Sequence, residues 1–257
     1  MKNMKNKELS YIAIIPARYA STRFPGKPLA KIGGVAMVER VYRRAEAAFD
    51  NVAVATDDSR IYDAVKAFGG NVVMTSEKHR SGTDRCREAY ANLGSDADVV
   101  VNIQGDEPFI SLKQLESVKE CFADSGVDIA SLARPFDPAR GFEALFDSNL
   151  VKVVMDTDMY AMYFSRSIIP YVRNYEWKEW LNHAKFHTHL GLYAYRTEVL
   201  ERLGELPQSP LELAESLEQL RWLQAGYRIK MALTDEPNIG IDTPADLELA
   251  EKYLVGL

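Results

Sequence analysis

Residues 98–103 read Asp98-Val99-Val100-Val101-Asn102-Ile103 and run straight into Gln104-Gly105-Asp106-Glu107-Pro108. A continuous apolar run of this length is typical of a strand buried on both faces, as in a parallel sheet covered by helices. The Gly and Pro residues that follow indicate that the strand ends in a turn. We therefore expect a buried strand that presents Asp106 at its carboxyl end.

On both sides of this stretch, short apolar runs alternate with segments of helical periodicity. This alternation predicts an α/β fold with a mostly parallel central sheet flanked by helices. Two apolar runs around Asp156-Thr157-Asp158 predict an antiparallel hairpin at 151–164. We expect one domain over residues 1–257, with a smaller antiparallel lobe inserted at about 134–195. The other expected elements are strands at 12–15, 52–55, 72–74, 127–132, 190–195 and 229–233, and helices at 37–49, 61–68, 86–93, 112–122, 211–224 and from Thr243-Pro244 onward.

The composition of the chain excludes several classes of protein. Its 257 residues include 31 Lys and Arg against 37 Asp and Glu, and the resulting net charge of -6 argues against a nucleic-acid-binding surface. No apolar run is long enough to span a membrane, and no secretory segment follows the first residues. Cys86 and Cys121 lack metal-ligand spacing, and we interpret both as reduced core thiols. We expect a cytoplasmic protein without membrane or nucleic-acid partners.

The loop after the first expected strand concentrates positive charge. Residues 16–29 carry Arg18, Arg23 and Lys27 between prolines and a glycine. Such a loop can wrap a polyphosphate with its backbone N–H groups while Arg18 and Lys27 neutralise the phosphate charge. It matches neither a Walker A loop nor a G-x-G-x-x-G loop. A solvated basic loop with a turn at its Pro-Gly pair is the alternative.

Two acidic residues are candidates for a magnesium site. Ligands in open α/β sheets bind beyond the carboxyl ends of the strands, where Asp106 is expected. Mg²⁺ takes one or two protein carboxylates and completes its shell with water and phosphate oxygens. Asp242 is the second candidate, because it precedes the predicted start of the last helix. Each has a structural alternative, Asp106 as a turn former and Asp242 as part of helix capping.

A third polar loop, at residues 79–85, reads His-Arg-Ser-Gly-Thr-Asp-Arg and stands before a predicted helix. Its small hydroxyl residues and its glycine suit close backbone contact with a planar base. They suit simple helix capping equally well. The sequence leaves both interpretations open.

Together these segments resemble the 3-deoxy-manno-octulosonate cytidylyltransferases, also called CMP-Kdo synthetases, where Kdo is the eight-carbon sugar acid. The resemblance covers nearly the whole chain. It is carried by Ile14 to Leu29, Ser81 to Arg85, Asn102 to Pro108, Tyr163 to Arg166, His189 to Tyr195, Leu217 to Arg221 and Gly240 to Pro244.

The resemblance implies a Rossmann-like nucleotidyltransferase that uses Mg²⁺, acts as a homodimer and serves lipopolysaccharide synthesis. In the implied reaction the anomeric hydroxyl of Kdo attacks the α-phosphate of CTP and releases pyrophosphate. Asp106 and Asp242 would hold Mg²⁺, and Arg18 and Lys27 would complete the catalytic set. The implied substrate contacts are Ala17, the loop residues Ser81, Gly82 and Thr83 for CTP, and Arg23, Gln104, Arg166, His189, Tyr193, Glu218 and Gln219 for the sugar acid.

Two positions depart from the pattern of this family. Asn174 stands where an acidic residue is expected, and Arg80 stands where the neighbour of Ser81 is commonly uncharged. Both change which polar groups of a sugar can be satisfied. An 8-amino-3,8-dideoxy analogue of Kdo is therefore an alternative substrate. More distant alternatives are a nine-carbon nonulosonic acid cytidylyltransferase and a non-catalytic sugar-nucleotide-binding protein.

Overall fold

The computed structural model describes residues 9–20, 23–237 and 239–255. The chain divides into two compact units. The first comprises Met1–Pro108, Tyr195–Leu200 and Gly240–Leu257, and the second comprises Phe109–Ala194 and Glu201–Ile239. Among the helices of the described residues, none combines the length and apolarity needed to cross a membrane. The expected inserted lobe at about 134–195 stays a prediction.

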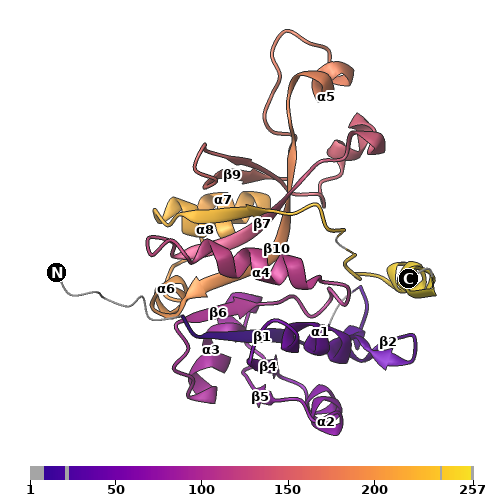
Figure 1. The fold of residues 1–257 in the computed structure, drawn as a ribbon, viewed down its shortest axis with the longest axis vertical. Coiled ribbons are helices and arrows are strands. Elements are labelled where there is room, and N and C mark those ends of the chain that lie inside the picture. The colour runs from indigo at the N-terminus through magenta and orange to yellow at the C-terminus, as the bar shows by residue number, and fades with distance from the viewer. Residues whose placement is uncertain (1–8, 21–22, 238, 256–257) are drawn as a thin grey trace, which may run out of the picture. The chain divides into compact units, whose positions relative to one another are not determined.

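Four parallel strands form the sheet of the first unit, in the order β6-β1-β4-β5 (Figure 1). In this sheet Ile14 lies opposite Ala53 and Asn102. The strand at 98–103 is confirmed as buried, because every residue of β6 is buried. The bounds are β1 (Tyr11–Ala17), β4 (Asn51–Thr56), β5 (Val72–Met74) and β6 (Val99–Asn102).

Two helices of the first unit begin at residues whose side chains cap them. Asp58 caps α2 by accepting from the Arg60 N–H, and Ser81 caps α3 by accepting from the Asp84 N–H. The predicted start at Thr243-Pro244 is confirmed, because α9 begins at Pro244. The sequence did not indicate the short pair β2–β3 or helix α6. The bounds are α1 (Met37–Glu46), α2 (Ser59–Ala67), α3 (Gly82–Leu93), α6 (Thr197–Leu203), α9 (Pro244–Val255), β2 (Lys31–Ile32), β3 (Val35–Ala36) and the 3₁₀ turn η1 (Lys27–Leu29).

In the second unit β7 lies between β11 and β10, and β8 joins β10 to β9. The predicted hairpin at 151–164 is confirmed, because β8 and β9 pair antiparallel and Val153 lies opposite Phe164. β7 and β11 pair parallel. The mostly parallel α/β class is thereby confirmed. The bounds are β7 (Ile129–Pro135), β8 (Lys152–Met155), β9 (Ala161–Ser165), β10 (His187–Arg196) and β11 (Ile229–Leu233).

The predicted long helix at 211–224 is wrong, because the structure has two short helices there. Ser216 separates them in the left-handed region, with φ of 51°. Tertiary contacts outweigh the helical periodicity, since the Glu215 carboxylate is bound by the Ser165 hydroxyl and the Arg166 N–H. The helical segments of this unit are α4 (Leu112–Cys121), α5 (Trp180–His183), α7 (Pro210–Glu215), α8 (Gln219–Gln224), η2 (Pro138–Arg140), η3 (Phe142–Phe146) and η4 (Trp177–Glu179).

Both cysteines are thiols that form no disulfide, as predicted. Cys86 is buried in α3 and Cys121 is half-buried at the end of α4. Burial raises the pKa of the Cys121 thiol to about 11. Because the thiolate is the reactive form, this cysteine is an unreactive packing residue at neutral pH.

Candidate active site

A cavity of about 230 Å³ lies in the first unit, where the loops after β1 and β6 meet the start of α3. Cationic, acidic and small polar side chains line it together. This composition fits a charged ligand better than an apolar one. Of the predicted site residues, the cavity is lined by Ala17, Arg18, Arg23, Lys27, Ser81, Gly82, Gln104, Asp106 and Asp242.

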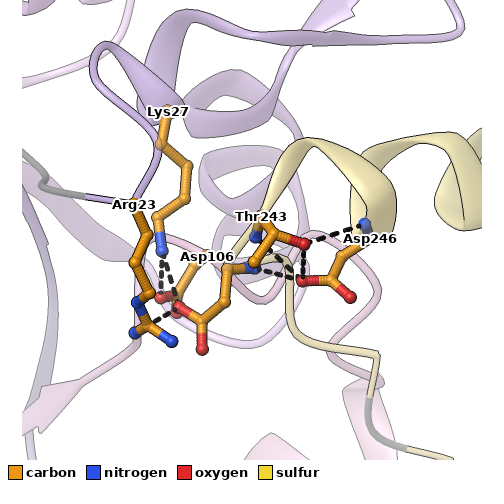
Figure 2. Close-up of polar contacts among 6 residues, drawn as sticks. Arg23, Lys27, Asp106, Thr243 and Asp246 are labelled. Atoms are coloured by element: carbon orange, nitrogen blue, oxygen red, sulfur yellow. Dashed lines mark hydrogen bonds and ion pairs between the residues drawn. The ribbon is translucent and has the colours of Figure 1, made fainter.

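Lys27 joins the two predicted metal ligands. Its ammonium Nζ lies 2.7 Å from Asp106 Oδ2 and 3.2 Å from Asp242 Oδ1 (Figure 2). Arg23 Nη2 donates to the same Asp242 oxygen at 3.1 Å. The two carboxylates, far apart in the sequence, therefore converge on one ammonium group inside the cavity. The structure thus brings the Asp106 and Asp242 carboxylates together, as expected.

Backbone packing brings Asp106 to this place. A Cβ added at Gly105 would lie 2.9 Å from the carbonyl oxygen of Pro16, a separation that real Cβ atoms almost never show. Only glycine lets the loop after β6 pass this close to the end of β1. The Ile241 N–H then donates to the Asp106 carbonyl at 2.9 Å. This bond ties the segment of Asp242 directly to that of Asp106.

The start of α9 holds Asp242 beside the cavity. Asp246 Oδ2 accepts from the Asp242 N–H at 3.1 Å, from the Thr243 N–H at 2.8 Å and from the Thr243 hydroxyl at 2.8 Å (Figure 2). Burial opposes ionisation of Asp246, but these hydrogen bonds and the nearby Arg23 outweigh it and lower the pKa of the carboxyl group. Asp246 is thus an ionised acceptor at neutral pH.

The cations of the cavity fall into two groups. Arg23, Lys27 and Arg85 are paired with carboxylates: Arg23 and Lys27 contact Asp242 and Asp106 on the cavity wall, and Arg85 pairs with Asp57 at 2.6 Å. Arg18 and Arg80 are exposed at the cavity and make no ion pair with any residue in the described part of the chain. These two guanidinium groups are therefore available to an anionic ligand.

The loop at 79–85 serves helix capping at Ser81, whose hydroxyl accepts from the Asp84 N–H at 3.1 Å. Gly82 lines the cavity and leaves room for a ligand to approach the backbone. Thr83 does not line it, because its side chain is buried and its hydroxyl lies 3.3 Å from that of Tyr195. Sequence reasoning left capping and ligand contact as alternatives, and the geometry allows both in one loop.

Six cavity residues were absent from the predicted site, namely Pro16, Pro28, Gly105 and three with ionisable side chains, His79, Arg80 and Arg85. His79 lines the wall and is held by a hydrogen bond between its Nε2 and Glu88. Arg80 directly precedes the capping residue Ser81, and Arg85 is the fourth residue of α3. Their position next to the predicted Ser-Gly-Thr segment was a usable signal for all three. Their side-chain directions depend on the start of α3, which spacing alone does not give.

The remaining predicted residues belong to the second unit, and their roles stay predictions. There the guanidinium group of Arg166 donates through Nε to the Glu215 carbonyl at 2.6 Å, through Nη1 to the Ser148 carbonyl at 2.8 Å and through Nη2 to the Ser216 carbonyl at 3.3 Å. A guanidinium group has five N–H donors, so these bonds leave two of them for an incoming carboxylate. The bonds to the Glu215 and Ser216 carbonyls also cap the end of α7.

His189 and Tyr193 lie near each other on β10, with ring centroids 5.3 Å apart. Burial lowers the pKa of His189 to about 3, and its Nε2 lies 3.0 Å from the Ser131 hydroxyl. His189 is therefore a neutral hydrogen-bonding group, with no positive charge to offer a carboxylate at neutral pH. At the start of α8, Glu218 accepts from Arg221 Nη2 at 2.9 Å and Gln219 is buried.

The comparisons with known proteins agree with one another. The cytidylyltransferase family matches residues 12–229. A 3-deoxy-manno-octulosonate cytidylyltransferase from Parabacteroides distasonis is 58% identical over 247 residues, which cover 96% of this chain and 98% of that protein. The corresponding protein from Bacteroides thetaiotaomicron is 57% identical over 246 residues, with 96% and 98% covered.

Solved structures extend the comparison. A CMP:2-keto-3-deoxy-manno-octonic acid synthetase complexed with CTP is 41% identical, with a TM-score of 0.88 over 96% of this chain and 99% of that one. A 4-diphosphocytidyl-2C-methyl-D-erythritol synthase from Anaerococcus prevotii shares the fold, with a TM-score of 0.61 at 16% identity over 96% and 99% of the two chains. Family, identity and coverage lead to one assignment: the chain belongs to the 3-deoxy-manno-octulosonate cytidylyltransferase family.

Proposed function

We propose that this chain transfers CMP from CTP to the anomeric hydroxyl of Kdo and releases pyrophosphate, as a step of lipopolysaccharide synthesis. The names of the relatives that are 57–58% identical support this substrate pair. The observation that carries the proposal is the contact of Lys27 with Asp106 and Asp242 in one cation-lined cavity. That set of charges suits a nucleoside triphosphate together with a hard divalent cation.

The donor chemistry of the site fits Mg²⁺. Asp106 and Asp242 offer carboxylate oxygens at one place, and no group of three or more metal-binding side chains occurs in the part of the chain that the structure describes. Magnesium normally takes only one or two protein carboxylates and leaves the other positions to water and phosphate. When bound there, Mg²⁺ would stabilise phosphate charge and make the attacking hydroxyl more acidic.

The protein side of the reaction is positioning and charge stabilisation. Arg18 is exposed at the cavity, where it can bind phosphate oxygens of CTP, and Lys27 can exchange a carboxylate for a phosphate contact. Gly82 gives the nucleoside close access to the backbone. We assign the sugar carboxylate to the two remaining N–H groups of Arg166, with His189 as a neutral hydrogen-bonding neighbour.

We further propose a cytoplasmic homodimer. Neither cysteine forms a disulfide, which suits a reducing compartment. An aromatic surface supports the dimer: in the second unit a cavity of about 710 Å³ is lined by Phe146, Tyr171 and Trp177, among others, and Phe146 and Tyr171 are exposed. Exposed aromatic clusters of this kind are common at subunit interfaces. Sedimentation of the purified protein tests the dimer.

The function is tested by pyrophosphate release from CTP with Kdo, its 8-amino-3,8-dideoxy analogue or a nonulosonic acid. We expect the highest kcat/KM with Kdo and none without an acceptor. Asp106→Asn should lower kcat by about 100-fold, a barrier increase of about 3 kcal/mol, with the far-UV circular dichroism unchanged. Preference for another acid would reassign the substrate, and full activity of the Asn variant would reject the role of Asp106.

A further inference from the structure

Asp246 is placed to control the carboxylate that precedes its helix. Its Oδ2 accepts hydrogen bonds from the Asp242 N–H, the Thr243 N–H and the Thr243 hydroxyl, at 3.1, 2.8 and 2.8 Å (Figure 2). We propose that Asp246 is a positioning residue, which fixes Asp242 in the orientation needed to bind the divalent cation. This inference rests on the proposed function of the cavity.

Two successive backbone N–H groups, those of Ile241 and Asp242, are hydrogen-bonded and hold the backbone that leads to the Asp242 side chain. The Ile241 N–H donates to the Asp106 carbonyl at 2.9 Å, and the Asp242 N–H donates to Asp246 at 3.1 Å. Two successive N–H groups thus have fixed partners. The Asp242 side chain then reaches Lys27 with little backbone freedom left. Loss of the Asp246 contact would release one of the two anchors.

Ordinary helix capping does not require the bond to Asp242. In α4 the Ser111 and Gln114 side chains form a capping box, and in α7 the same is formed by Ser209 and Glu212. Those boxes satisfy the N–H groups of the first turn and of the capping residue itself. At α9 the third helical residue, Asp246, also accepts a hydrogen bond from the N–H of Asp242, the residue before the capping Thr243. This additional bond holds the backbone of the residue whose carboxylate is the candidate metal ligand.

Asp246 does not line the cavity, so it acts through Asp242 and not as a ligand. Groups that orient metal ligands in this way are worth a substantial part of metal affinity. Their removal typically weakens binding by about 10-fold to 100-fold. We place Asp246 at the lower end, because the bond of Ile241 to Asp106 remains when Asp246 is replaced.

The test measures Mn²⁺ binding to the full-length protein without nucleotide, by the electron paramagnetic resonance signal of free Mn²⁺. Asp246→Ala should raise the Kd by about 10-fold. Ser111→Ala removes a capping box in the second unit and is the matched control. Both variants should lower the melting temperature, but the Ser111 variant should keep the Kd within about twofold of the wild-type value. A Kd for Asp246→Ala as close to wild type as the control would overturn the proposal.

A conservative variant separates orientation from charge. Asp246→Asn keeps a side-chain oxygen that can accept from both N–H groups but removes the negative charge. We expect it to restore most of the Mn²⁺ affinity that the Ala variant loses. Equal losses in the Asn and Ala variants would assign the effect to charge and reject positioning.

Asp106→Asn distinguishes failure of this inference from failure of the proposed function. If the wild-type protein binds Mn²⁺ and the Asp106 variant does not, the metal assignment stands and the Asp246 variants alone decide the inference. If Asp106→Asn leaves Mn²⁺ binding unchanged, the cation does not bind at the proposed carboxylates. In that case both the proposed metal site and the role of Asp246 are rejected.

Discussion

Replacing Lys27 by Gln should strengthen divalent-metal binding in the absence of nucleotide. The Lys27 ammonium lies 2.7 Å from Asp106 and 3.2 Å from Asp242, so it contacts the same oxygens that a cation would need. A metal ion must therefore displace this ammonium before it can bind both carboxylates. The neutral Gln side chain removes the competing charge and also the repulsion between ammonium and metal.

The size of the effect follows from the distances and the exposure of the groups. Two unit charges about 3 Å apart attract each other by about 1.4 kcal/mol in water and by about 5 kcal/mol at an effective dielectric constant of 20. The Lys27 side chain is 15% exposed, but Asp106 is 31% and Asp242 is 48% exposed, so the lower figure applies. We therefore expect the Kd for Mn²⁺ to fall by about tenfold.

The assay is the same Mn²⁺ titration, with isothermal calorimetry of CTP binding beside it. Lys27→Gln should bind Mn²⁺ more tightly and CTP more weakly, because the phosphates lose a cationic partner. Lys31→Gln, an exposed change of equal charge in β2, corrects for the net charge of the protein. A Lys27 variant with unchanged or weaker Mn²⁺ binding would refute the competition between ammonium and metal.

Two further predictions concern Gly105 and His189. Gly105→Ala would place a Cβ 2.9 Å from the Pro16 carbonyl, so we expect urea unfolding to show a loss of about 1–3 kcal/mol of stability and the kcat to fall. The control is Gly240→Ala, whose Cβ would meet nothing within 4 Å and which should change neither quantity. Equal behaviour of the two variants would contradict the steric role of Gly105. The pKa of His189 is lowered to about 3, so the unfolded chain binds this proton more readily than the folded one, and stability falls as the pH drops below about 6.5. Urea unfolding measured at pH 7 and pH 5 should show the wild-type protein losing about 2 kcal/mol more unfolding free energy than His189→Gln. If the unfolding free energies of the two proteins fall in parallel, His189 is not buried as a neutral group.

The parts of the fold that depend on local pattern could be predicted from the sequence. The apolar run of β6 and the hairpin of β8 and β9 were found because burial and alternation leave a direct mark on residue order. The position of Asp106 was predictable for a topological reason, since ligands of open α/β sheets gather beyond the carboxyl ends of the strands. Its pairing with Asp242 was implied only by the family resemblance, because local sequence fits helix capping at Asp242 equally well.

The features that the sequence could not give depend on side-chain partners from distant segments. The break at Ser216 was hidden because its helical periodicity continues on both sides, while the partners of Glu215 lie on β9 and just after it. Likewise the burial of Thr83 against Tyr195 is invisible in a loop of small polar residues. Lys27 was predicted as a phosphate ligand, and its contact with two carboxylates appears only in three dimensions.

The two candidate metal ligands lie on either side of the second unit in the sequence, since that unit occupies Phe109–Ala194 and Glu201–Ile239. The site can therefore form only after the chain has returned to the first unit. The bond from the Ile241 N–H to the Asp106 carbonyl, at 2.9 Å, fixes that return at the backbone, independently of the side chains that bind the metal. The spacing of the two carboxylates is thus held by contacts within the first unit, to which Gly105, Ile241 and the start of α9 all belong. Every residue that lines the cavity belongs to this unit as well, so its charge chemistry is determined there.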